Sequence, residues 1–173
     1  MRTMKLKTLA ALLVLFVGVA SSAEDPWQPL RFLVGTWTGE GDGAPGQGTG
    51  SFSFHLDLQD KVLIRKNRAD YPATKERPAL SHEDLMVIYP EERGKRWKAV
   101  YFDNEGHVIH YSVELSKDQE VLTFLSNALP SAPRFRLTYT KEREGKLAIR
   151  FEIAPPGKPD GFSTYLEAVA RKR

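Results

Sequence analysis

The sequence predicts an all-β fold, an antiparallel up-and-down barrel of about ten strands with a short helical turn at its N-terminal side. Hydrophobicity has a period of two, most clearly where Phe52, Phe54, Leu56 and Leu58 alternate with polar residues. Similar segments continue to the C-terminus, separated mostly by short turns with glycine or small polar residues. No amphipathic stretch is long enough for a crossover helix, which favours an antiparallel meander over a parallel sheet.

The predicted elements follow one another with mostly short connections. A helical turn is expected over residues 26–33, where an apolar segment precedes the first strand and would cover one end of the barrel. The strands are predicted at residues 36–41, 51–58, 61–71, 83–89, 96–103, 107–115, 120–126, 134–141, 146–154 and 162–171. Longer connections that contain proline are predicted at residues 72–81, 129–133 and 155–161. Closure of such a meander into a barrel removes the exposed strand edges.

Residues 1–23 have the three parts of a secretory signal peptide, namely basic residues, an apolar run over 9–20 and small residues up to Ala23. The apolar run has about a dozen residues, whereas a membrane-spanning helix needs roughly twenty. We therefore predict cleavage near Ala23, which leaves residues 24–173 as a single barrel domain. The mature protein is expected to be periplasmic or secreted, without stable insertion in a membrane. An uncleaved N-terminal anchor is the alternative.

Composition excludes several classes of function. The chain has no cysteine, which excludes disulfides, thiol catalysis and zinc bound by cysteine. Without the three basic residues of the leader, 22 lysines and arginines stand against 22 aspartates and glutamates. A formally neutral mature chain argues against a nucleic-acid partner. A cysteine-free export product is typical of a bacterial periplasm.

The segment around Trp37 carries a resemblance to a known group of proteins. Gly35, Thr36 and Trp37 follow the apolar turn and precede the Gly-Glu-Gly of residues 39–41. This segment resembles the opening of lipocalin-like barrels of the calycin group, in particular nitrobindin-like barrels and related uncharacterised bacterial exported proteins. The specific resemblance covers about residues 29–43. It implies that Trp37 packs across the closed end of the barrel and that a small, mostly apolar ligand occupies the interior.

The period of two also predicts which side chains enter the barrel. If Lys66 and Arg68 face the solvent, Arg65 and Asn67 face inward, and a barrel of this size leaves room for a small ligand. The expected pocket residues are Trp37, Phe54, Arg65, Asn67, Trp97, Tyr101 and Tyr139. Arg65 offers a rigid donor fork that suits a carboxylate or another anionic head. The alternatives for Arg65 are a side chain that extends to the solvent, or a structural pair with an internal acid. For the aromatic residues the alternative is plain core packing.

We predict a binding protein for a small hydrophobic or amphipathic molecule, without catalysis and without a cofactor. A haem-binding barrel is the first alternative, because the resemblance to nitrobindin-like barrels implies haem held by a histidine late in the chain. No histidine follows His110, so that ligand position lacks its usual residue and haem would need His110, a tyrosine or a methionine. A dedicated metal site is not expected, since the histidines and carboxylates form no closely spaced set of ligands.

Two further alternatives concern catalysis and assembly. An enzyme acting on a small carbonyl substrate would use Tyr101, Tyr139 and Arg65 to polarise the carbonyl group. Separately, strand segments near residues 62–64, 85–88 and 121–122 are apolar on both faces, unlike a strand whose outer side meets water. Either a homodimer or the protein's own N-terminal segment and long loops would cover that outer surface.

Overall fold

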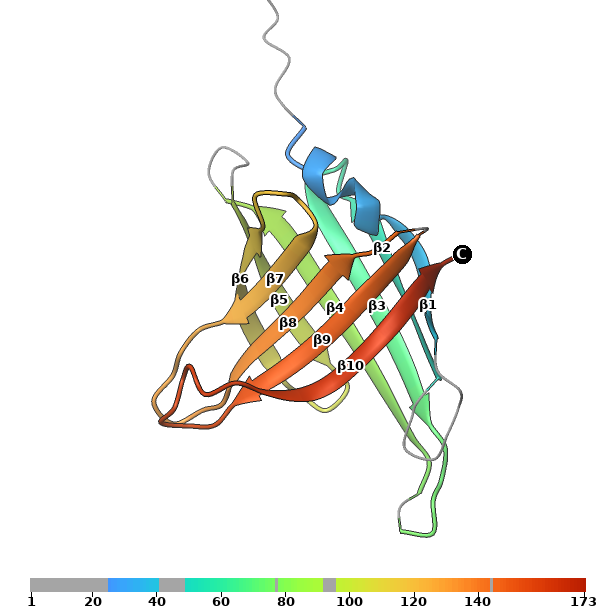
Figure 1. The fold of residues 1–173 in the computed structure, drawn as a ribbon, viewed down its shortest axis with the longest axis vertical. Helices are drawn as coiled ribbons and strands as arrows, with labels where there is room; N and C mark the ends of the chain where they lie inside the picture. The colour runs from blue at the N-terminus through green and yellow to red at the C-terminus, as the bar shows by residue number, and fades with distance from the viewer. Residues whose placement is uncertain (1–24, 41–48, 77, 92–95, 144) are drawn as a thin grey trace, which may run out of the picture.

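In the computed structural model of the protein, the chain forms a closed barrel of ten antiparallel strands in meander order (Figure 1). The structure describes residues 25–40, 49–76, 78–91, 96–143 and 145–173. A 3-10 helix, η1 (Gln28–Leu33), precedes the strands. The strands are β1 (Gly35–Glu40), β2 (Thr49–Asp57), β3 (Val62–Tyr71), β4 (Leu80–Pro90), β5 (Trp97–Asp103), β6 (Val108–Leu115), β7 (Val121–Ser126), β8 (Arg134–Lys141), β9 (Lys146–Ala154) and β10 (Ser163–Lys172). The predicted all-β meander barrel with a short N-terminal helical turn is confirmed. The predicted signal peptide lies outside the described residues.

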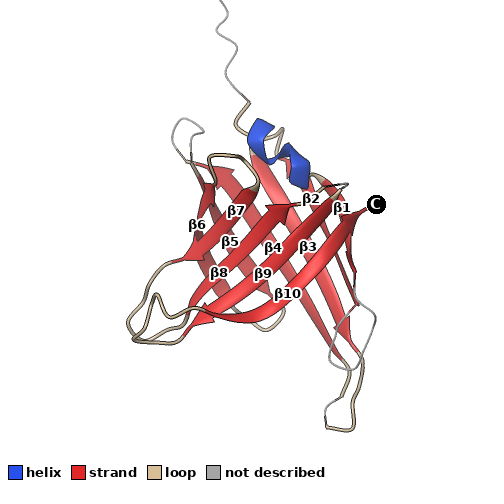
Figure 2. Ribbon diagram, in the orientation of Figure 1, coloured by secondary structure: helices blue, strands red, loops and turns tan. Residues whose placement is uncertain are grey.

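Each strand pairs with its neighbours in sequence, and β1 pairs with β10 to close the barrel. The helix η1 lies across one end, which we call the helix end, and the opposite end is the far end (Figure 2). The connections at the far end include the longer segments after β3, β7 and β9. No helix within the described part of the chain is long and apolar enough to cross a membrane.

The helix end is packed solid by aromatic and aliphatic side chains. Trp37 of β1 stacks on Phe52 of β2 with ring centroids 6.1 Å apart, and its indole Nε1 donates to the Leu33 carbonyl at 2.7 Å. Trp27 is almost fully buried and donates from Nε1 to the carbonyl of Asp60 at 2.8 Å. Asp60 belongs to the β2–β3 turn. Both tryptophans therefore tie η1 to the end of the barrel.

The turn that receives Trp27 has an unusual backbone. Leu58, Gln59 and Asp60 all have positive φ, between 50° and 61°, a conformation that non-glycine residues seldom adopt. The Lys61 amide donates to the carbonyl of Asp57 at 3.0 Å and closes the turn. The hydrogen bond from Trp27 to Asp60 thus fixes a strained loop against η1.

The start of β4 differs from the prediction. β4 begins at Leu80 rather than at residue 83, because Tyr71, Asp70 and Ala69 of β3 continue the ladder opposite its first three residues. His82, expected at the end of a loop, therefore lies within a strand. The extension pairs His82 with Ala69 of β3 and so adds a histidine to the wall of the barrel at the far end.

Candidate ligand-binding site

A buried ion pair between neighbouring strands lies inside the barrel. Arg65 of β3 donates from Nη1 to Oδ1 of Asp84 on β4, and Asn67 donates from Nδ2 to Oδ2 of Asp84 at 2.8 Å. The side chains of Arg65 and Asp84 are only 9% and 4% exposed. Arg65 also lies over the ring of Phe52, with 5.5 Å between the guanidinium carbon and the ring centroid. Of the interpretations open for Arg65, the structure thus shows a pair with an internal acid.

Two polar atoms beside this pair have no hydrogen bond of good geometry to any described residue, namely Arg65 Nε and the hydroxyl of Tyr139. Tyr139 is fully buried, and its hydroxyl lies against the guanidinium. Burial raises the pKa of Tyr139, although the charge of Arg65 opposes the rise. Burial lowers the pKa of Arg65, but the interactions with Tyr139 and Asp84 have the larger effect, so the pKa of Arg65 is raised above its ordinary value. Both groups keep their protons, so the arginine is a cation and the tyrosine a neutral hydroxyl.

Tyr101 of β5 extends the polar contacts toward the far end. His82 Nε2 lies 3.1 Å from the Tyr101 hydroxyl and 3.5 Å from Oδ2 of Asp84. The Tyr101 hydroxyl donates to Oδ2 of Asp103 at 3.2 Å. Burial, followed by the charges of Asp84 and Asp103, raises the pKa of Tyr101, so this hydroxyl also stays protonated. We call Arg65, Asn67, His82, Asp84 and Tyr101 the polar cluster.

The carboxylate of Asp103 fixes the turn between β5 and β6. Its side chain is 4% exposed and accepts hydrogen bonds from the backbone amides of Glu105 and His107, at 3.0 Å and 2.8 Å. The ring of His107 lies 2.9 Å from Oδ2 of Asp103, and His82 Nδ1 lies 3.0 Å from Glu105. Burial raises the pKa of Asp103, but the hydrogen bonds from His107 and Glu105 outweigh it and hold the pKa below its ordinary value.

On the side opposite the polar cluster, the far end of the barrel is apolar. Phe135 of β8 stacks on Phe151 of β9 with ring centroids 5.9 Å apart, and Tyr165 of β10 meets Phe151 edge to face at 6.1 Å. Phe135, Phe151 and Ile149 pack against the core but remain partly exposed. In the closed strand order β9 and β10 lie across the barrel from β4 and β5. The interior at the far end therefore has an apolar side and a polar side.

The seven predicted pocket residues fall into three groups inside the barrel. Arg65, Asn67 and Tyr101 belong to the polar cluster, next to Tyr139. Phe54 packs edge to face against Tyr139, at 5.7 Å between ring centroids, as part of the aromatic core. Trp37 lies at the helix end. Trp97 starts β5 opposite Pro90 and is therefore also near the helix end, away from the polar cluster.

His82, Asp84 and Asp103 were not among the residues predicted for the site. Asp84 stands beside Glu83 at the expected start of a strand, where a charged pair is ordinarily solvated, and the structure shows instead that Asp84 is buried. Met86 and Ile88 lie two and four residues further along β4 and are fully buried, so they share the inner face with Asp84. That signal was hidden because Leu85 and Val87 on the outer face are apolar as well.

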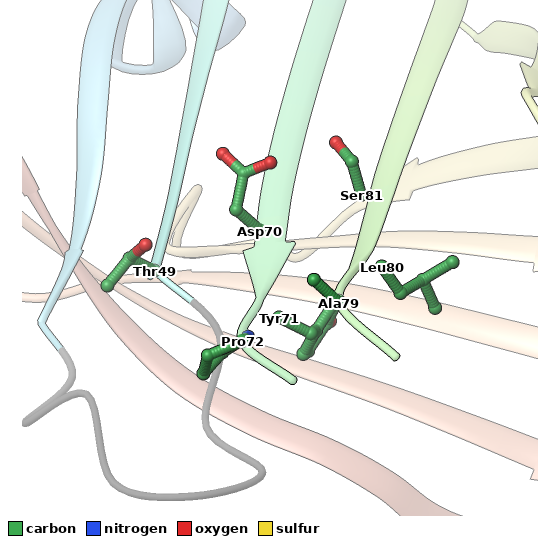
Figure 3. Close-up of a pocket in the computed structure, with 7 residues that line it drawn as sticks. All are labelled: Thr49, Asp70, Tyr71, Pro72, Ala79, Leu80 and Ser81. Atoms are coloured by element: carbon green, nitrogen blue, oxygen red, sulfur yellow. The ribbon is translucent and has the colours of Figure 1, made fainter. Parts of the chain in front are cut away.

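Two hollows of the surface lie away from the polar cluster. One, of about 510 Å³, lies at the far end, where the ends of β2, β3 and β4 contribute its lining (Figure 3). Asp70 lines this hollow and pairs with Arg68 at 3.0 Å. The other, of about 820 Å³, extends over β7 to β10, where Arg136 forms a two-pronged pair with Glu152. Asp70 in the first hollow and Arg136 and Glu152 in the second are therefore already engaged in ion pairs within the protein.

The remaining histidines lie outside the barrel interior. His110 pairs with Val100, its neighbours Tyr111 and Ile109 face inward, and its own side chain is exposed. His55 is on the outer face of β2, 3.9 Å from Asp57. Among the described residues no group of three or more histidines, aspartates and glutamates is arranged to hold a metal ion. Haem binding stays a prediction. His110, one of the residues considered as a haem ligand, is directed away from the interior.

The sequence matches no protein-family model, and no curated protein is significantly similar to it. The closed antiparallel barrel is nevertheless the architecture that the resemblance to calycin-like barrels implies. The finer resemblance to nitrobindin-like barrels stays a prediction.

Proposed function

We propose that this protein binds a small hydrophobic or amphipathic molecule in the far-end half of the barrel. The observation that carries the proposal is the change in packing along the barrel axis. At the helix end Leu30, Leu33 and Leu147 are fully buried, whereas the inward-facing Ile149 and Phe151 nearer the far end are partly exposed. Partly exposed apolar side chains inside a barrel offer a ligand surface that burial would stabilise.

The polar cluster opposite these residues suits the head of an amphipathic ligand. Asn67 and Tyr101 are partly exposed, so core side chains do not cover the cluster completely. The proposal includes export, on the basis of the predicted leader with cleavage near Ala23, and does not include catalysis. A homodimer stays a prediction, based on the partly exposed outer residues Ile64 and Val87.

The first test is native mass spectrometry of the mature protein purified from its own host. We expect a non-covalent adduct with the mass of a lipid-like or aromatic small molecule, lost when the protein is unfolded. A protein that carries no adduct and that takes up none of a panel of amphiphiles would contradict the proposal.

Two variants, each with one alanine replaced by tryptophan, test the location of the ligand. Ala168→Trp places an indole in the interior opposite Ile149, whereas Ala148→Trp places the same indole on the outer face opposite Val169. Both alanines are partly exposed, so both variants are expected to fold. Only Ala168→Trp should abolish the adduct. Equal retention of ligand by both variants would place the binding site elsewhere.

A further inference from the structure

The chemistry of the ligand head follows from the groups that the polar cluster leaves free. Arg65 Nε is a donor without a partner among the described residues, on a residue that is 8% exposed. A guanidinium has no acceptor atom, so this nitrogen needs an acceptor, which is either the Tyr139 hydroxyl that lies against the guanidinium or an oxygen of the ligand. An ammonium head has donors alone and cannot supply one. The Tyr139 hydroxyl, which lies against the guanidinium without a hydrogen bond of good geometry, can donate its proton to a ligand oxygen.

The charge of the cluster restricts the head further. The cation of Arg65 is already paired with Asp84, whose second oxygen accepts from Asn67. Asp84 is also opposite Asp103 in the β4–β5 register, and both side chains are 4% exposed. A ligand carboxylate at this position would meet two acids with little water to screen them, and like charges that close are strongly unfavourable.

We propose that the barrel selects a ligand whose head is an uncharged oxygen, either a hydroxyl or a carbonyl, and that Asp84 is the residue that excludes carboxylates. This inference rests on the proposed function and names the ligand class of the same site. It replaces the expectation that Arg65 anchors an anionic head. The apolar part of the ligand lies against Phe135, Ile149 and Phe151.

The test compares three probes with the same alkyl chain, 1-decanol, decanoic acid and decylamine, titrated into the delipidated mature protein by calorimetry. At pH 8 the acid is ionised and the amine is protonated. We expect 1-decanol to bind at least about tenfold more tightly than decanoic acid, because one unfavourable charge contact costs several kcal/mol. It should also bind more tightly than decylamine, whose ammonium has no acceptor atom for the guanidinium and shares its charge. This comparison needs no variant.

Asp84→Asn then tests the role of the acid. The asparagine keeps an acceptor oxygen for Arg65 but leaves the guanidinium uncompensated. The preference for 1-decanol over decanoic acid should fall by at least about tenfold, since an adjacent cation now stabilises the carboxylate. The matched control is Glu152→Gln, which breaks the pair with Arg136, another arginine–carboxylate pair between neighbouring strands, whose residues line the hollow over β7 to β10 and do not belong to the polar cluster. The control should leave the preference unchanged.

The outcomes separate the inference from the proposed function. If decanoic acid or decylamine binds the wild-type protein as tightly as 1-decanol, the inference is wrong while ligand binding in the barrel stands. The same holds if a folded Asp84→Asn protein keeps the wild-type preference, or if Glu152→Gln shifts it equally. If none of the three probes binds, the proposed function fails, and the inference fails with it.

Discussion

Removal of Asp84 is the most informative perturbation of stability. Asp84→Ala would leave the Arg65 guanidinium, whose side chain is 9% exposed, without its counter-charge in the interior of the barrel. Breaking a buried ion pair in this way costs about 3 to 5 kcal/mol. The substitution also removes the acceptor of the 2.8 Å hydrogen bond from Asn67. Since small domains are stable by about 5 to 15 kcal/mol, a loss of this size is a large fraction of the total.

The double variant Arg65→Met/Asp84→Leu isolates the cause. With both charges replaced by apolar side chains, no uncompensated charge remains, and such replacements are often neutral or stabilising. We therefore expect the double variant to be more stable than Asp84→Ala. The coupling free energy between the two positions, obtained with the single variants Arg65→Met and Asp84→Leu, should lie in the range of about 0.5 to 3 kcal/mol found for residues of one ion pair.

Urea unfolding, followed by tryptophan fluorescence and far-ultraviolet circular dichroism, measures these differences. The control is Glu167→Ala, which breaks the pair with Arg150 at 2.8 Å across β9 and β10, where the side chains are 57% and 60% exposed. Exposed pairs contribute little to stability because water and ions screen them. If Asp84→Ala lowers the free energy of unfolding no more than Glu167→Ala does, the argument that Asp84 compensates a buried charge is refuted.

Two further predictions concern pH. The pKa of Asp103 is lowered in the folded protein, so its contribution to stability is present above the ordinary pKa of about 4 and is lost as the pH falls through the folded value. Asp103→Asn should therefore flatten the acid side of the stability profile, measured by urea unfolding between pH 6 and pH 2; an unchanged profile would contradict this. Burial raises the pKa of Tyr101, Tyr111 and Tyr139, so three of the six tyrosines should ionise only as the protein unfolds in alkali. Ultraviolet titration to pH 12 would disprove this if all six ionise together near pH 10.

The pattern of apolar residues predicted most of the fold, because alternation depends on neighbours along the strand. Phe52 and Phe54 are buried between partly exposed serines, as their alternation predicts. Arg65 and Asn67 lie on the inner face of β3 for the same reason, since the charged Lys66 and Arg68 between them fix the phase. Where polar and apolar residues alternate, the sequence alone therefore assigns the inner face.

The candidate site was predictable only in part. Arg65, Asn67, Tyr101 and Tyr139 were expected inside, but the partner of Arg65 was not. In β4 the residues on both sides of Met86 are apolar, so the sequence could not tell which face Asp84 occupies. Only the pairing of β3 with β4 sets Asp84 opposite Asn67 and within reach of Arg65.

The sequence by itself determined that this chain forms an antiparallel barrel, with Trp37 near the closed end and Arg65 directed inward, because strand period and turn residues are local properties. Tertiary structure decided the charge inside the barrel. The register of β3, β4 and β5 brings Arg65, Asp84 and Asp103 together, and this depends on how residues distant in sequence align across the sheet. The proposed selection of an uncharged ligand head rests on that local charge, because like charges repel strongly where little water screens them.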